Sequence, residues 1–288
     1  MSTSNETTQI TRANKRFIKE GTFGIHTGIL MLGSLVLAGA IIPRVSKFGP
    51  DELASMPLAP PGRSNFFGTD VLGRDVFVRV FDAVFIDLGT AIIGVTIPLI
   101  VGTIVGTLLG ISQNKRVNSV VGSLIDGINA FPFLVFVIAL IAFIGPGVGS
   151  IVLAISLVNW ARYARIARTR AVVVNIQGYV EAARTLGFSK KRILFKHIIP
   201  NVSSETRAYA LSDFIIVIIA IAALSFLGLG IKPPQAEWGG MIRDGKDLLT
   251  VGFWWPTVFP GIALCWAGIA VAFISEGLTR RMREVGTR

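Results

Sequence analysis

Six stretches of this 288-residue chain are apolar over roughly the 20 residues that a helix needs to cross a bilayer. Hydrophobic residues make up 52% of the sequence and charged residues only 16%, so lipid is the expected solvent for most of the surface. The sequence therefore predicts an all-α polytopic membrane protein with six transmembrane helices. The expected spans are residues 22–42, 84–111, 120–144, 148–166, 207–230 and 257–278.

The net charge of +11 indicates membrane orientation and not nucleic-acid binding, because the basic residues alternate with the spans. They precede the first span, occupy the loops after the second and fourth, and follow the last. By the positive-inside rule, both termini are then cytoplasmic. The basic residues concerned are Arg12, Lys15, Arg16, Lys19, Lys115, Arg116, Arg162, Arg165, Arg168, Arg170, Arg184, Lys190, Lys191, Arg192, Lys196, Arg280, Arg281, Arg283 and Arg288.

The first span is separated from the others by a segment of about forty residues that mixes acidic and basic side chains. We expect residues 1–83 to comprise a cytoplasmic tail, an uncleaved anchor helix and an extracytoplasmic segment, and residues 84–288 to form a five-helix core. The single cysteine, Cys265, lies in the last span, which excludes a disulfide framework and a cysteine-based metal site.

The loop between the fourth and fifth spans, residues 167–206, is polar and basic. Its pattern predicts a short helix over Gly178–Leu186, which Gly187 ends. Ser189 then serves as the N-cap of a second helix, which Pro200 brings to an end. Two short helices between membrane spans suggest a docking device.

Three residues of this loop suit contact with a partner. Ala182 and Ala183 have almost no side chain, so a partner surface can approach the helix backbone. Glu181 lies near a helix start, where the dipole favours a carboxylate, and it can accept hydrogen bonds. The alternative is an amphipathic loop that lies on the inner leaflet.

Charged residues near the membrane interior are functional candidates. Asp126 and Asp213 lie at the inner ends of the third and fifth spans, and we expect each to pair with a neighbouring arginine. Arg162, Arg165 and Arg168 recur every third residue and form one stripe on a helix. This stripe either anchors the protein to lipid head groups or transmits movement from the loop as a rigid stalk.

Small residues indicate close helix packing. Gly102, Gly106 and Gly110 lie on one face of the second span, a spacing that lets helix backbones approach each other in a membrane.

No catalytic constellation is evident. Residues 240–247 match a phosphate-binding loop until Asp247, which stands where Ser or Thr should ligate magnesium. His26 and His197 are far apart in sequence, and neither a Gly-x-Ser-x-Gly nor a His-Glu-x-x-His motif occurs. We expect a non-enzymatic chain with no metal or cofactor of its own, so any active transport must draw energy from a partner.

The polar loop resembles that of the permease subunits of ATP-binding-cassette (ABC) importers, which carry Glu-Ala-Ala, three residues, Gly, and an apolar-x-apolar-Pro close. Here Glu181-Ala182-Ala183, Gly187 and Ile198-Ile199-Pro200 match. In that family the loop is a coupling helix that seats in a groove of the ATPase subunit. The resemblance implies that the docking residues are Glu181, Ala182, Ala183, Arg184, Leu186, Gly187 and Pro200.

Two further motifs resemble signatures of the second permease in the dipeptide, oligopeptide and nickel group. They lie at residues 67–75, together with Arg79, and at residues 224–239. The chain departs from that subgroup at residues 82–88, where an Arg and a Ser are lost, and at residues 275–281. The matching signature residues are Gly68, Thr69, Asp70, Gly73, Arg74, Asp75, Ser225, Gly228, Gly230, Trp238 and Gly239.

The resemblance implies a type I ABC importer fold in a bacterial or archaeal inner or plasma membrane. Its implied partners are a homologous second permease, two ATPase subunits that bind ATP and Mg, and an extracytoplasmic solute-binding protein. Peptide is the expected substrate, with nickel or another metal complex as the alternative. A rival from another class is an ion-coupled carrier or channel, which the scarcity of mid-span charge and of any inverted repeat disfavours.

Overall fold

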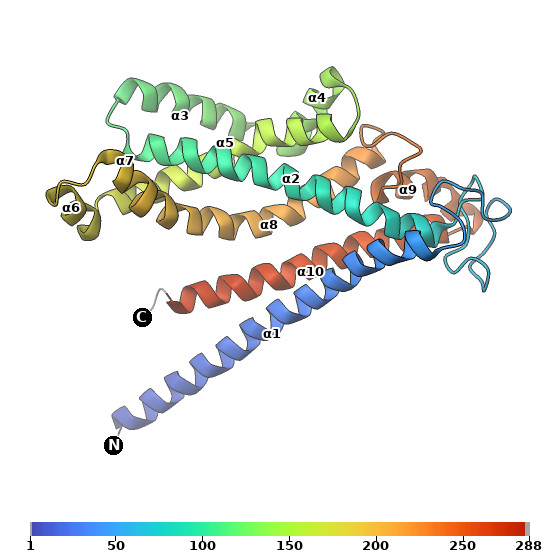
Figure 1. Ribbon diagram of the computed structural model, residues 1–288, viewed down its shortest axis with the longest axis horizontal. Helices are drawn as coiled ribbons and strands as arrows, with labels where there is room; N and C mark the ends of the chain where they lie inside the picture. The colour runs from blue at the N-terminus through green and yellow to red at the C-terminus, as the bar shows by residue number, and fades with distance from the viewer. Residues whose placement is uncertain (1, 286–288) are drawn as a thin grey trace.

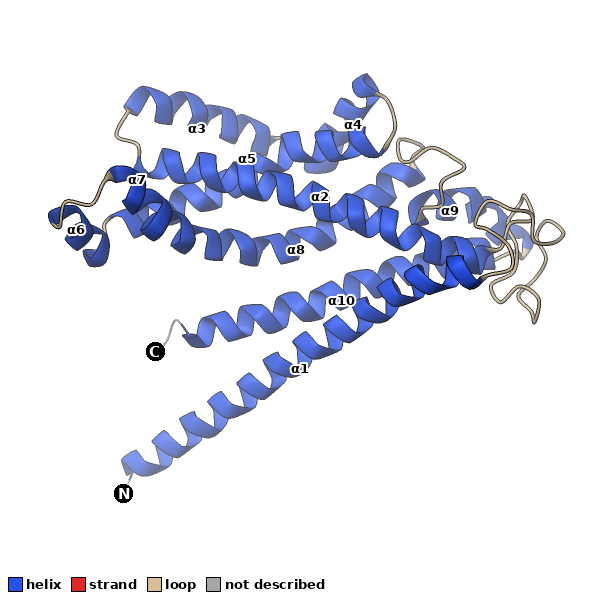
Figure 2. Ribbon diagram, in the orientation of Figure 1, coloured by secondary structure: helices blue, strands red, loops and turns tan. Residues whose placement is uncertain are grey.

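The structure is a computed structural model that describes the backbone of residues 2–285 and the side chains of residues 22–280. Within that range the ordered elements are helical, apart from two isolated β-bridges, and Figure 2 shows helices joined by loops. The elements are α1 (Ser2–Val45), α2 (Val76–Ile111), α3 (Lys115–Ala130), α4 (Phe133–Ile144), α5 (Val148–Asn175), α6 (Gly178–Thr185), α7 (Lys190–Ile193), the π-helical turn η1 (Leu194–Ile198), α8 (Ile199–Phe226), α9 (Trp238–Gly245), the 3-10 turn η2 (Lys246–Val251) and α10 (Trp255–Val285).

The long helices α2, α5 and α8 form the centre of the molecule (Figure 1). Helices α3 and α4 lie on one side of this centre, and α1 and α10 lie on the other (Figure 1). The short helices α6 and α7 are at one end, whereas the 46–75 segment and α9 are at the opposite end. The start of α1 and the last turns of α10 lie toward the end that carries α6 and α7 (Figure 1).

The predicted glycine face on α2 packs directly against α5. A Cβ added at Gly102, Gly106 or Gly110 would collide with a backbone carbonyl oxygen of α5. The three carbonyls belong to Trp160, Ala164 and Arg168, which follow the same four-residue spacing. The prediction of close helix packing is confirmed, and α2 and α5 form the most closely joined pair of the fold.

Four helical stretches are long and apolar enough to cross a membrane, or five if a bent pair counts as one span, among the residues described. They are Thr22–Val45, Val76–Ile111, Lys190–Phe226 and Trp255–Arg280, and the bent pair is Lys115–Ala130 with Phe133–Ile144. The predicted 148–166 span is not among them, although it lies in the continuous helix α5. Helix α5 carries Asn159 and several arginines, which lower its apolar character.

The prediction of one continuous span over residues 120–144 is wrong. Helices α3 and α4 meet at an angle of 95°. Pro132 causes the break: it has no backbone N–H to donate, and it forces Phe131 out of the helical region to φ −84° and ψ 142°. The stretch is therefore a bent helix pair.

Candidate functional site

The predicted short helix in the polar loop is α6, and Gly187 ends it as expected. Gly187 has a φ of +79°, in the left-handed region that glycine adopts without steric cost. Its N–H donates to the Arg184 carbonyl at 3.0 Å, and the Phe188 N–H donates to the Ala183 carbonyl at 3.1 Å. These two bonds form a Schellman motif, which closes the helix with a reversal of the chain.

Most of the predicted docking residues are exposed. Glu181, Ala182, Arg184 and Gly187 face solvent, and the Leu186 side chain is 73% exposed. Ala183 is the exception, since it is only 4% exposed and belongs to a buried cluster of the subunit itself. The expectation that a partner approaches both alanines is therefore corrected to Ala182 alone. The buried cluster comprises Ala167, Ala171, Val174, Val180, Ala183, Ile193, Ile198 and Val202.

The second half of the loop begins as predicted but does not end at Pro200. The Ser189 hydroxyl accepts a hydrogen bond from the Arg192 N–H at 3.3 Å, so Ser189 is the N-cap of α7. The helical path then continues through η1 into α8, with Pro200 in the first turn of α8. A proline is tolerated there because the wider π-helical turn before it does not follow the α-helical hydrogen-bonding pattern. The loop is thus continuous with α8.

Side-chain contacts fix the loop to α5 as well. Arg184 donates a short hydrogen bond to Asn175 at the end of α5. Arg170 of α5 forms an ion pair with Glu205 of α8 at 3.2 Å. The first contact joins α6 to α5, and the second joins α5 to α8.

The arginine stripe on α5 contacts the bent helix pair. Arg165 pairs with Asp126 of α3 at 2.7 Å, which confirms the pairing expected for that carboxylate. Arg162 lies over the Phe133 ring of α4 at 4.8 Å, and the Arg168 guanidinium lies beside Gly122 of α3. Since the Arg165 and Asp126 side chains are more than half exposed, we expect this pair to contribute little stability.

The pairing predicted for Asp213 is wrong. Asp213 is fully buried and accepts hydrogen bonds from the Asn159 amide and the Tyr163 hydroxyl, each at 2.8 Å. The two donors are four residues apart on α5, so one face of that helix presents both to α8. Asp213 therefore joins α5 to α8 in the interior, through neutral partners.

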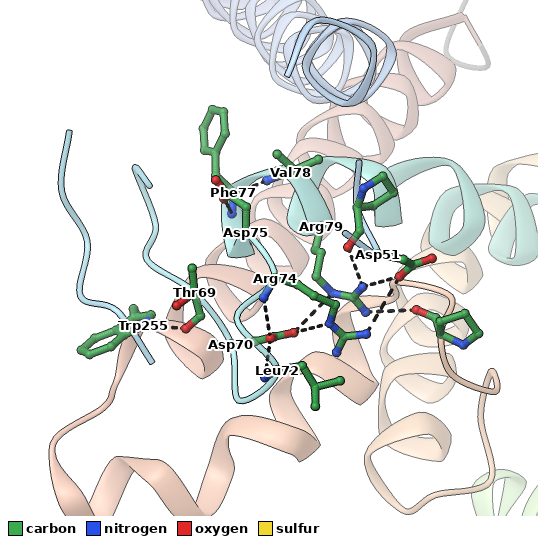
Figure 3. A network of polar contacts seen from close by, with 12 residues as sticks. Asp51, Thr69, Asp70, Leu72, Arg74, Asp75, Phe77, Val78, Arg79 and Trp255 are labelled. Atoms are coloured by element: carbon green, nitrogen blue, oxygen red, sulfur yellow. Dashed lines mark hydrogen bonds and ion pairs between the residues drawn. The ribbon is translucent and has the colours of Figure 1, made fainter. Parts of the chain in front are cut away.

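The first signature motif folds the 46–75 segment onto the start of α2, as Figure 3 shows. Asp70 accepts hydrogen bonds from the backbone N–H groups of Leu72 and Arg74, and from the Arg74 side chain at 2.7 Å. Asp75 caps α2 by accepting from the Phe77 N–H at 2.8 Å. The Thr69 carbonyl accepts a hydrogen bond from the Trp255 indole N–H at 3.0 Å.

Arg79 is the centre of this network and is only 4% exposed. Its guanidinium donates to Asp51 at 2.6 Å and to the carbonyl groups of Pro50 and Pro234 at 2.8 and 3.2 Å. The turns of the motif depend on Gly68 and Gly73, whose φ values are +72° and +81°. The motif thus connects three distant parts of the chain.

The second signature packs α9 against α2 and α8. The Trp238 side chain is completely buried, and its indole donates to the Val80 carbonyl at 2.9 Å. An added Cβ at Gly239 would collide with Ala222 of α8, and one at Gly230 with Ser225. Gly228 ends α8 with a φ of +83°. These signature residues serve close packing.

Sequence reasoning missed the role of Asp87. It lies in the 82–88 stretch, which was noted only for what the subgroup pattern had lost. The buried Asp87 carboxylate accepts a hydrogen bond from the Trp238 backbone N–H at 2.9 Å and so caps α9 from α2. A carboxylate within the apolar second span was the available signal.

Glu237 is the N-cap of α9 and lies outside the candidate spans. Burial raises the pKa of its carboxyl to about 7, although hydrogen bonds from the Gly240 and Gly239 N–H groups act in the opposite direction. Because the folded pKa lies above the unfolded value of 4.5, folding binds a proton, and stability is lost as the pH rises through about 7. Between pH 5 and 8, we expect the free energy of unfolding of the wild type to fall by roughly 3 kcal/mol relative to that of Glu237→Gln. Thermal unfolding of both proteins across this pH range measures the difference. If the stability of the two proteins changed in parallel with pH, the raised pKa of Glu237 would be contradicted.

These features define a multi-span membrane protein with an exposed helical loop between α5 and α8, a tightly packed helical core and no catalytic constellation among its described side chains. The chain belongs to the family described as "Binding-protein-dependent transport system inner membrane component", whose model matches residues 99–284. It is therefore a non-catalytic, multi-pass permease of the inner membrane. As part of a binding-protein-dependent ABC transporter, it functions with an ATPase and a binding protein.

Several curated proteins are similar over most of their length. A putative peptide transport system permease of Brucella suis biovar 1 is 34% identical over 92% of this chain and 88% of the relative. The dipeptide permease DppC of Bacillus subtilis is 34% identical over 76% of this chain and 68% of the relative. The oligopeptide permease OppC of the same organism is 31% identical over 87% of this chain and 82% of the relative.

A solved structure titled an amino acid ABC transporter with histidines has a similar fold. It superposes with a TM-score of 0.52 at 20% sequence identity, covering 70% of this chain and 94% of the solved chain. At this identity the likeness concerns the fold alone, which is that of an ABC importer permease.

Proposed function

We propose that this chain forms half of the translocation pathway of an ATP-driven importer for dipeptides or oligopeptides. The observation that carries the proposal is α6, an exposed helix with the Glu-Ala-Ala motif that is hydrogen-bonded to α5 and leads through α7 into α8. The names of the relatives, which are peptide permeases, support peptide as the substrate.

The proposed assembly contains a homologous second permease, two ATPase subunits that bind ATP and Mg, and an extracytoplasmic solute-binding protein. This chain would contribute six spans, namely α1, α2, the bent α3–α4 pair, α5, α8 and α10. With α6 on the cytoplasmic side, we expect both termini to be cytoplasmic too, since the start of α1 and the last turns of α10 lie toward α6 (Figure 1). In this arrangement α1 and the 46–75 segment are peripheral, and residues 167–206 are the coupling loop. The core begins with α2 at Val76, slightly before the predicted boundary at residue 84.

The proposed mechanism is alternating access. ATP binding closes the ATPase pair, and the seated α6 helices move with it. Because α6 is fixed to α5 through Arg184 and continues into α8 through α7, the movement reaches two core helices together. Asp213 holds those helices to each other, so they turn as one body and expose the pathway to the other side.

Glu181→Lys tests the docking. The charge of an exposed carboxylate on α6 is reversed, so we expect the ATPase subunits to be lost when the complex is purified in mild detergent, while the second permease is retained. Mass spectrometry of the co-purified proteins measures this. The matched control is Glu52→Lys, an exposed glutamate in the 46–75 segment at the opposite end, which should keep all subunits. ATPases retained by the Glu181 variant would refute the docking role.

The assignment of peptide as the substrate is tested in a separate experiment. Binding proteins recovered with the wild-type complex are screened with di- and oligopeptides and with nickel complexes, and uptake of the bound ligand is followed in proteoliposomes. Binding of nickel alone would refute the peptide assignment and leave the docking result intact.

A further inference from the structure

Helix α1 changes its packing partner along its length and leaves a space beside this crossover. At Gly28 its backbone lies against the Ala270 carbonyl of α10, and at Gly39 it lies against Phe81 and Val84 of α2. Over the three turns between these glycines, α1 passes from one helix to the other. Figure 1 shows α1 beside α10 along this course.

The crossing leaves a cavity of about 320 Å³. Its walls come from α1, α2 and α10 and from Phe67 of the 46–75 segment, with Ala38, Phe81, Phe259 and Trp266 among the other lining residues. For comparison, an apolar cavity of about 150 Å³ in a protein core is enough to bind benzene. The space is large enough to hold a length of hydrocarbon chain.

The lining side chains offer no free hydrogen-bond donor to a ligand. Only two of its side chains carry a hydrogen-bond donor, Ser34 and Trp266. The Ser34 hydroxyl donates to the Met31 carbonyl at 2.7 Å, and the Trp266 indole donates to the same carbonyl at 3.1 Å. A polar solute would find no side-chain donor here and only the Ser34 hydroxyl oxygen as an acceptor, so the lining favours an apolar occupant.

The position of the cavity identifies the source of that occupant. All three helices that form its walls are candidate membrane spans, and the protein is an inner-membrane permease. The wall residues Ile262 and Trp266 are 53% and 43% exposed, so the lining continues onto the lipid-facing surface. We propose that the cavity binds one acyl chain of a membrane phospholipid, which fills the gap between α1 and the core.

Photolabelling tests this proposal. The assembled transporter is placed in nanodiscs that contain a phospholipid with a diazirine in the middle of one acyl chain, and labelled peptides are mapped by mass spectrometry. We expect adducts on peptides containing Phe81 and Phe259. Ala38→Phe and Ser34→Phe each place a ring in the cavity, so either should lower this labelling roughly tenfold. Ala272→Phe, at an exposed site of α10 outside the cavity, should leave it unchanged.

A second measurement does not depend on labelling chemistry. In detergent, added phospholipid should raise the unfolding temperature of wild type, and the two filling variants should respond less, because their cavity no longer admits the chain. Equal labelling and equal lipid response in wild type and both filling variants would overturn the proposal. Cross-links from the lining residues to a protein subunit in place of lipid would also overturn it.

Discussion

Replacing Gly187 by valine is expected to lower ATP-driven uptake by about tenfold or more, while the subunit still reaches the membrane. An added Cβ would meet no atom within 4 Å, so the effect comes from the backbone and not from a clash. A β-branched residue at φ +79° is strained, and relief of that strain breaks the two hydrogen bonds that close α6. The helix would then lose its fixed position relative to α7.

Gly187→Asn provides the control, because asparagine tolerates the left-handed conformation better than other side chains. It should retain most of the uptake measured in proteoliposomes. If the valine variant transports as well as the asparagine variant, the conformation of this turn has no part in coupling.

Trp238→Ala is expected to destabilise the protein by about 3–5 kcal/mol, the range for removal of a large aromatic side chain from a core. The Trp238 side chain is completely buried between α2 and α9, so its loss leaves a void at the contact that holds α9. The unfolding temperature of the purified complex measures the effect.

Two further variants separate the contribution of packing at Trp238 from that of its hydrogen bond. Trp238→Phe keeps most of the volume but loses the hydrogen bond to Val80, so a smaller loss of about 1 kcal/mol is expected. Trp254→Ala removes an indole that is 46% exposed and should cost less than the loss of the buried one. Equal effects of the Trp238 and Trp254 alanine variants would contradict the packing role.

The elements that could be predicted from the sequence were those with a local signal. Gly187 is recognisable because a glycine follows a short helical pattern, and Ser189 because it precedes one. The glycine face on α2 was visible as a four-residue repeat, and the structure places α5 against it. In each case one segment of chain contains the whole pattern.

Two of the failures, at Asp213 and Asp87, depended on how separate segments meet. Asp213 was expected to pair with an arginine, but the register of α5 against α8 presents Asn159 and Tyr163 to it. The role of Asp87 required knowing that α9 begins beside α2. The break between α3 and α4 did have a local signal, Pro132, but the prediction of a span over residues 120–144 followed hydropathy alone.

The close contact between α2 and α5 also constrains the order of events during synthesis. The glycine face of α2 meets backbone atoms of α5, yet the whole of α3 and α4 lies between them in sequence. When the ribosome has made the chain only as far as α4, α2 is already complete and its native partner does not yet exist. The nascent α2 must therefore remain with lipid or the insertion machinery until α5 emerges, and a chain terminated before Val148 cannot form the central helix pair at all.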